Sequence, residues 1–242
     1  MKTDDPSYLV ALDTMTGKPL WRQERPTDAF RESPDAYTTP VVLQHNGQTQ
    51  IVVTGGDCVT GHDPETGKEL WRADGLNPQQ RGNYRIVASS LAVDGMVYAP
   101  TRNRPLLVLP AGGKGDVTDS VVWKWDGAGS PDVPTPVCDG EYFYMLSDRG
   151  LITCLNAKTG EVIWGPERTS QGTVSSSPLL ADGKLYLLNE NAVTTVVQAG
   201  PEFKVLGTNE LDGTYTLSSP VVSGSQVFIR TATHLYCIGE EE

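Results

Sequence analysis

The residues that most often carry catalysis or metal binding are scattered through this chain. The three histidines, His45, His62 and His234, do not form a pair at metal-ligand spacing. The sequence contains no G-x-S-x-G nucleophile motif. None of the four cysteines belongs to a C-x-x-C pair; they are Cys58, Cys138, Cys154 and Cys237. The pattern therefore indicates no metal centre, no dithiol redox site and no hydrolase nucleophile.

Two of the cysteines occupy the same place in similar tetrapeptides. Cys154 lies in Ile-Thr-Cys-Leu and Cys237 in Leu-Tyr-Cys-Ile. Equivalent positions in repeats that are not neighbours lie too far apart for a disulfide. We therefore expect both to be buried free thiols.

A glycine-rich stretch, Gly112-Gly113-Lys114-Gly115-Asp116, superficially resembles a phosphate-binding loop. No helix is expected after it, so the helix N-terminus that binds an anion is missing. We interpret this stretch as a solvated turn.

A nine-residue pattern ending in tryptophan occurs three times, at residues 13–21, 63–71 and 156–164. Its first residue, Asp or Asn, can accept hydrogen bonds from turn amides, and its glycine can adopt positive φ. The tryptophans could form an aromatic ligand site, but recurrence at one repeat position favours packing between repeats. The predicted structural anchors are Trp21, Trp71, Trp123 and Trp164.

A second recurring signal divides the chain into units of about 40 to 50 residues. Thr-Pro, Ser-Pro or Ser-Ser precedes a short apolar run, a two-residue turn and an alternating strand. Each unit predicts a four-stranded antiparallel meander, which is the blade of an all-β propeller. We count about five and a half blades in one domain, residues 1–242, with no linker. The units cover about 7–26 (partial), 37–75, 86–127, 132–170, 173–213 and 215–240 (partial).

Composition excludes several classes of partner. The net charge of −11 argues against nucleic acid and against anionic lipid surfaces. No stretch is apolar enough to span a membrane, and the polar start Met1 to Pro6 lacks a signal peptide. Localisation stays open: either the protein is cytosolic or the chain lacks its natural beginning.

The pattern from Ala11 to Trp21 resembles the tryptophan-docking repeat of the quinoprotein, or PQQ-type, propellers. The ending from Ser219-Pro220 to Ile238 resembles the last blade of BamB-like proteins, which are non-enzymatic members. This resemblance implies a periplasmic or exported scaffold that binds protein or peptide. It also implies an eight-bladed propeller. Either the chain lacks roughly two and a half N-terminal blades, or it closes as a six-bladed ring.

The alternative is an enzyme, a divergent or partial PQQ-dependent dehydrogenase acting on alcohols or sugars. Such enzymes hold PQQ and Ca²⁺ and often show adjacent cysteines. This chain has no adjacent cysteines, and no residue maps onto the catalytic Asp or the Ca²⁺ ligands. We therefore predict neither PQQ nor calcium, and the sequence points to no small-molecule substrate.

The loops between the second and third strands of each unit are the candidate binding surface. They should lie on the face where the chain enters each first strand, and they vary in residue type as recognition loops do. The alternative interpretation, that these loops are only solvated loop tips, is equally open. The arginines among them should share a face suited to an acidic or peptide partner. The candidates are Asp57, Arg102, Arg104, Arg149, Asn189 and Arg230.

Overall fold

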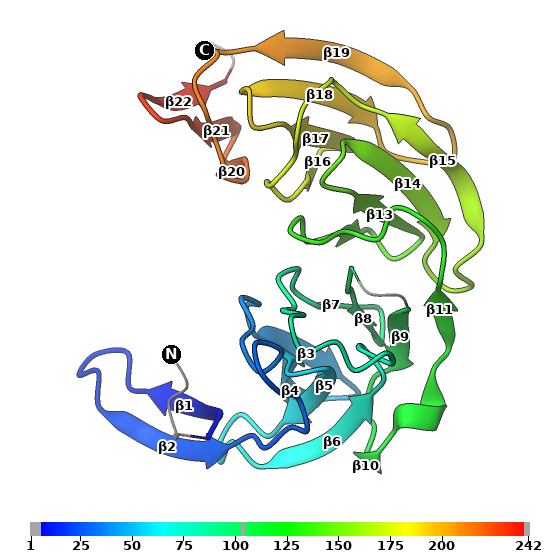
Figure 1. The fold of residues 1–242 in the computed structure, drawn as a ribbon. Helices are drawn as coiled ribbons and strands as arrows, with labels where there is room; N and C mark the ends of the chain where they lie inside the picture. Colours follow the sequence, from blue (N-terminus) through cyan, green and yellow to red (C-terminus); the bar gives the residue numbers. More distant parts are fainter. Residues whose placement is uncertain (1–5, 103–104, 240–242) are drawn as a thin grey trace. The chain divides into compact units, whose positions relative to one another are not determined.

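The computed structural model describes residues 6–102 and 105–239, and these form a succession of antiparallel sheets. Figure 1 shows the consecutive strands of each blade lying side by side as a meander. The chain divides into two compact units, residues 1–124 and 125–242, which are described separately below. The assignment of the whole chain to a single domain stays a prediction.

The first unit contains a two-stranded sheet and two blades. The two-stranded sheet is β1 (Tyr8–Leu12) and β2 (Pro19–Glu24). The next sheet contains β3 (Val41–His45), β4 (Gln48–Gly55), β5 (Cys58–His62), β6 (Glu69–Asp74) and β10 (Gly115–Asp116). The third contains β7 (Leu91–Val93), β8 (Met96–Ala99), β9 (Leu106–Pro110) and β11 (Trp123–Trp125). A short 3-10 helix, η1 (Thr118–Ser120), follows β10.

The second unit contains two four-stranded blades and a three-stranded sheet. The first blade is β12 (Val137–Cys138), β13 (Tyr142–Leu146), β14 (Leu151–Asn156) and β15 (Val162–Arg168). The second is β16 (Leu179–Ala181), β17 (Lys184–Leu188), β18 (Val193–Gln198) and β19 (Val205–Glu210). The last sheet is β20 (Val221–Ser223), β21 (Gln226–Arg230) and β22 (Leu235–Ile238). The four-stranded antiparallel sheets predicted for the blades are confirmed, and β10 adds a fifth strand to one of them.

Two-residue turns fix the first hairpin of several blades. Asn46, Asp94 and Asp182 all have φ between 46° and 48°, and the glycine after each also has positive φ. Two successive residues at positive φ define the type I′ turn, which matches the twist of paired strands. The Asn46-Gly47, Asp94-Gly95 and Asp182-Gly183 signals are therefore confirmed as hairpin turns.

The turn that opens the tryptophan pattern is held by its first side chain. Oδ1 of Asp63 accepts hydrogen bonds from the Glu65 and Thr66 amides and from the Thr66 hydroxyl. Gly67 closes the turn with φ +74° and donates its amide to the Asp63 carbonyl. The same arrangement occurs at Asp13, and these hydrogen bonds lower the pKa of both carboxyls.

Two of the tryptophans dock onto the corresponding turn of the following blade. The Trp21 indole donates from Nε1 to the Pro64 carbonyl at 3.1 Å, and its ring covers Gly67. A Cβ atom at Gly67 would lie 2.5 Å from the Trp21 ring. In the second unit the Trp164 indole donates to the Gly200 carbonyl at 2.8 Å. Each docked indole thus joins one blade to the next and gains the N–H partner that a packed tryptophan requires.

Three of the tryptophans have a small residue directly across from them on the third strand. Ala11 pairs with Trp21, Gly61 with Trp71 and Cys154 with Trp164. Gly61 lies against the Trp71 ring so closely that a Cβ atom would overlap the indole. The Trp71 N–H donates to Gln50 Oε1 at 2.8 Å within its own blade, unlike that of Trp21. The glycine two residues before Asp63 is therefore a steric requirement of Trp71.

The Thr-Pro and Ser-Pro signals mark a second contact between blades. The amide of Thr39 donates to the Ser89 hydroxyl, and the amide of Ser177 donates to the Ser219 hydroxyl. Thr135 donates to the Ser177 hydroxyl in the same way. Because the chain enters the first strand of each blade at these residues, the hydroxyls join successive entry segments.

Two sequence expectations were wrong. Gly115 and Asp116 form β10, which pairs in parallel with Trp71 and Arg72 of β6, so this stretch is an added strand and not only a solvated turn. Cys237 is exposed while Cys154 is buried, since β22 is the edge strand of a three-stranded sheet. Within the described residues all four cysteines are free.

The contact between Gly61 and Trp71 generates a stability prediction. Gly61→Ala should lower the free energy of unfolding by about 3 kcal/mol, because the added methyl group overpacks a closed site. Urea unfolding followed by circular dichroism measures this loss. The control is Gly207→Ala, because no atom lies within 4 Å of a Cβ built on that strand glycine. Equal effects of the two substitutions would contradict the steric account.

His62 generates a pH prediction. Its Nδ1–H donates to the Gly67 carbonyl at 2.9 Å, and its Nε2 lies 2.9 Å from the Thr60 hydroxyl. Burial lowers the pKa of His62 from its ordinary value of 6.5, so the unfolded chain binds this proton more readily. The free energy of unfolding should therefore fall as pH drops below 6.5.

Urea midpoints between pH 7.5 and about 5 measure that dependence. His62→Gln should flatten it, whereas His45→Gln, which keeps His62, should retain it. A slope unchanged by His62→Gln would show that other groups cause the dependence.

Candidate functional site

The loops between second and third strands lie against the segments that connect one blade to the next. The Leu76 amide donates to the Asp57 carbonyl at 3.2 Å, and the Val174 amide to the Asp148 carbonyl at 2.9 Å. The Ala232 amide donates to the Tyr215 carbonyl at 2.8 Å. These bonds place the loops beside the entry to the first strands, as the sequence predicts for a four-stranded blade.

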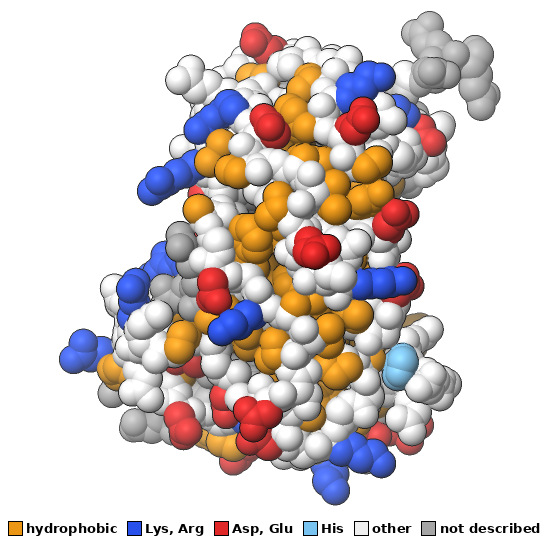
Figure 2. Space-filling model, turned by 90° about the vertical axis from the view of Figure 1, so that its right-hand side faces the viewer, with side chains coloured by type: hydrophobic (Ala, Val, Ile, Leu, Met, Phe, Trp, Pro, Cys, Tyr) orange, Lys and Arg blue, Asp and Glu red, His pale blue; other side chains and the backbone are white. Residues whose placement is uncertain are grey.

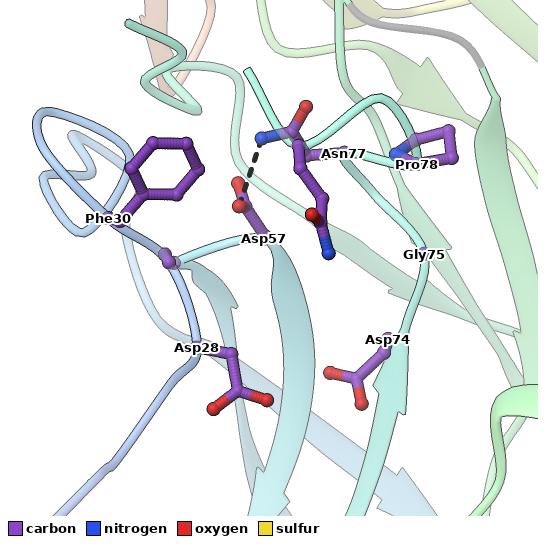
Figure 3. A pocket seen from close by; sticks show the side chains of 10 residues that line it. Asp28, Phe30, Asp57, Asp74, Gly75, Asn77 and Pro78 are labelled. Carbon is purple, nitrogen blue, oxygen red and sulfur yellow. Dashed lines mark hydrogen bonds between the residues drawn. The ribbon is translucent and has the colours of Figure 1, made fainter. Parts of the chain in front are cut away.

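In the first unit this arrangement encloses a cavity of about 310 Å³ (Figure 3). Its walls come from the segment after β2, the β4–β5 loop and the segment that begins at the end of β6. Asp28 and Asp74 lie on opposite sides of it, and Phe30 and Asp57 lie near one another at another side. The cavity thus combines three carboxylates with one aromatic ring.

Backbone geometry fixes Asp57 in this cavity. It has φ +68° and follows Gly56, where a Cβ atom would lie 2.8 Å from Thr27. Its Oδ2 accepts a hydrogen bond from the Asn77 amide at 2.9 Å, as the dashed line in Figure 3 shows. Its Oδ1 is buried and has no hydrogen-bond partner among the residues that the structure describes. Burial raises the pKa of Asp57, and the bond from Asn77 opposes this only in part.

The other two carboxylates extend the acidic surface. Asp28 and Asp74 form no ion pair with any described residue. Both also line a second cavity of about 490 Å³, where Glu69 is paired with Arg72 at 2.8 Å. The sequence pattern missed Asp28, Phe30 and Asp74, since they lie outside the second-to-third-strand loops.

In Figure 2, Asp and Glu side chains are interspersed with Lys and Arg on the face that is drawn. Within the described residues no three His, Cys, Asp or Glu side chains gather to hold a metal ion. The three carboxylates that line the cavity suit a cationic group of a ligand.

The remaining predicted site residues differ in their exposure to solvent. Asn189 is buried, accepts hydrogen bonds from the Asn191 and Val193 amides and donates to the Gln171 carbonyl, so it braces its loop from within. Arg102 is exposed, with its guanidinium 5.0 Å from the Tyr84 ring centre.

Arg149 and Arg230 are exposed in the second unit, and Arg104 lies outside the described residues. Arg102 belongs to the first unit, so a face shared by all the arginines stays a prediction. No helix in residues 6–102 or 105–239 has the length and apolar character needed to cross a membrane.

The strained surroundings of Asp57 generate a stability prediction. Because its pKa is raised in the folded state, its contribution to stability is present at low pH and lost as pH rises. Asp57→Asn should therefore leave the free energy of unfolding at pH 7 unchanged or raise it by up to about 1 kcal/mol. Asn also tolerates positive φ.

Urea unfolding at pH 7 measures the effect of Asp57→Asn. The comparison is Asp212→Asn, because the Asp212 carboxylate accepts hydrogen bonds from three threonine hydroxyls. This substitution should lower the urea midpoint. A clear loss of stability in Asp57→Asn would identify its carboxylate as a structural group.

Comparisons with known proteins agree with this architecture. A search of curated proteins finds no match. The crystal structure of BamB from Moraxella catarrhalis is similar, with a TM-score of 0.68 and 14% sequence identity. The similarity covers 96% of this chain and 66% of that one, and it confirms the β-propeller fold.

The family model described as outer membrane protein assembly factor BamB matches residues 2–118 and 115–201. These matches cover most of the chain and include three copies of the tryptophan pattern. The chain therefore belongs to the family of the outer membrane protein assembly factor BamB.

Proposed function

We propose that this chain is a non-catalytic propeller scaffold that binds a protein or peptide segment on its loop face, which in each unit is formed by the loops between second and third strands and the segments that connect the blades. Membership in an assembly-factor family supports this class of function. We further propose that the chain works in the periplasm, on polypeptides destined for the outer membrane or on the components that insert them. The chain spans 66% of the similar BamB structure, so these partners are part of the proposal.

The observation that carries the proposal is the preformed shape of the loop face. A candidate loop lines a cavity in each unit: Asp57 lines one of about 310 Å³, and Arg230 lines one of about 300 Å³. Backbone hydrogen bonds to the connecting segments hold both loops. Loops that are already ordered lose little conformational entropy on binding, which favours recognition of an extended segment.

The surroundings of the tryptophans support the proposal over a PQQ-dependent dehydrogenase. Such an enzyme stacks its cofactor on an exposed indole face. Here Trp21 covers Gly67, Trp71 packs between Gly61 and Gly113, and Trp164 lies 5.3 Å from the Phe203 ring centre. These rings are engaged in packing within the protein.

A binding assay tests the proposal. The probe is a urea-unfolded outer-membrane β-barrel polypeptide carrying a fluorescent label, diluted into solutions of this chain, and anisotropy reports binding. We expect Asp28→Asn combined with Asp74→Asn to weaken binding by about tenfold, since both carboxylates face the cavity. The matched control removes two exposed carboxylates outside that cavity, by Glu65→Gln with Asp119→Asn, and should bind like the wild type.

Two results would overturn the proposed function. One is equal weakening of polypeptide binding by both double variants, which would show that only the net charge of the chain matters. The other is reduction of a redox dye by the chain with added PQQ, Ca²⁺ and an alcohol or sugar, which would establish a dehydrogenase.

A further inference from the structure

The last blade carries an arginine where the two blades before it carry a buried leucine. Arg230 ends β21 as Leu146 ends β13 and Leu188 ends β17. Both leucines are fully buried, whereas Arg230 is exposed. Its guanidinium forms no hydrogen bond or ion pair with any residue that the structure describes. The repeat scaffold alone does not require a cation at this place.

Two apolar side chains stand beside this arginine on the segment that enters β20. Thr216 is buried and donates its hydroxyl to the Arg230 carbonyl at 2.7 Å. In an extended segment the residues on either side of it point the other way. Tyr215 and Leu217 accordingly project outward, and each is 53% exposed.

The preceding blade differs at the same places. Counting back from the Ser-Pro pair, Tyr215 corresponds to Thr173 and Leu217 to Ser175. Ser175 donates to Glu190 at 2.6 Å. The last blade thus presents two half-exposed apolar side chains where the preceding blade has Thr173 and the internally bonded Ser175.

Tyr215, Leu217 and Arg230 together line a cavity of about 300 Å³, and no acidic residue lines it. The carboxylate of the adjoining loop, Asp212, is fully engaged elsewhere. Its Oδ2 accepts hydrogen bonds from Thr231, Thr233 and His234 at 2.7 to 2.9 Å. Asp212 therefore fixes the loop that follows Arg230 and leaves the guanidinium to a ligand.

We propose that this cavity binds a peptide carboxylate that lies next to an apolar side chain. The guanidinium offers two parallel N–H donors that match a carboxylate, and Tyr215 and Leu217 supply the wall for the apolar group. The carboxylate can come from a chain terminus or from an Asp or Glu side chain. This inference rests on the proposed function, because it names the ligand of one part of the loop face.

Three acetylated peptides serve as probes in calorimetric titrations with the purified whole chain. The first ends in Leu-Phe with a free carboxylate, the second is its C-terminal amide, and the third carries an internal Glu-Phe pair and an amidated end. Binding of the first alone would assign a terminal carboxylate, and binding of the third would assign an acidic side chain. Binding of none, or of the amide as tightly as the acid, would overturn the proposal.

Variants locate the site. We expect Arg230→Gln to weaken binding of the carboxylate probes by about tenfold and Arg230→Lys by less, since Lys cannot form the two-pronged contact. Leu217→Ser and Tyr215→Thr, which restore residues of the preceding blade, should each weaken binding several-fold. The matched control is Lys158→Gln, which removes an exposed cation from the turn of the third tryptophan pattern, residues 156–164. This variant should bind the peptides like the wild type.

Each variant should keep the circular dichroism spectrum and urea midpoint of the wild type, since all the replaced side chains are exposed. Unchanged peptide affinity in Arg230→Gln contradicts the inference even if the unfolded barrel polypeptide binds. Conversely, peptides that bind through Arg230 while that polypeptide does not bind would contradict the proposed function alone.

Discussion

The close approach of a tryptophan to a glycine-containing turn is the constraint on which the rest of this structure depends. Trp21 covers Gly67 of the following blade, and its indole N–H reaches the Pro64 carbonyl. No larger residue fits under that ring, and the same turn needs a residue at positive φ. One glycine therefore meets two demands, one from its own turn and one from the neighbouring blade. A polar residue at the head of the turn supplies the remaining hydrogen bonds.

This packing has consequences at the opposite ends of the strands. With blades docked at one end, the hydroxyls of Ser89 and Ser219 join the entry segments through backbone amides. The connecting segments then bond to the loops between second and third strands. A position released from packing is free to vary, as Arg230 does where two other blades carry buried leucines. A repeated scaffold thus carries a surface on which neighbouring blades present different chemistry.

The sequence predicted the scaffold well because its signals are local. Asn46-Gly47 and Asp182-Gly183 define turns within four residues, and the Asp63 side chain bonds to amides two and three residues away. The pairing of Gly61 with Trp71 follows from one hairpin. Residues that form such contacts lie at a fixed spacing in the sequence, so they can be recognised when the spacing recurs in each repeat.

The site depends on contacts that leave no such spacing. Asp28 and Asp74 line one cavity although they lie in different segments, and neither belongs to the repeat pattern. The pairing of Gly115 with Trp71 joins residues across more than forty positions, so β10 could not be recognised. Asn189 belongs to a loop that the sequence offered as binding surface, and its own side chain is buried and braces that loop from within.

The central claim is that the loop face is ordered before any partner binds, and amide hydrogen exchange of the free chain tests it most directly. The informative amides are those of Val174, Glu190 and Thr216, which donate to Asp148, Thr173 and Glu190 carbonyls at 2.9 to 3.0 Å. If the face is preformed, these amides should exchange within about tenfold of the slow amides of β17. Exchange at the rate of an unstructured peptide would show that the loops are not held and would contradict the account.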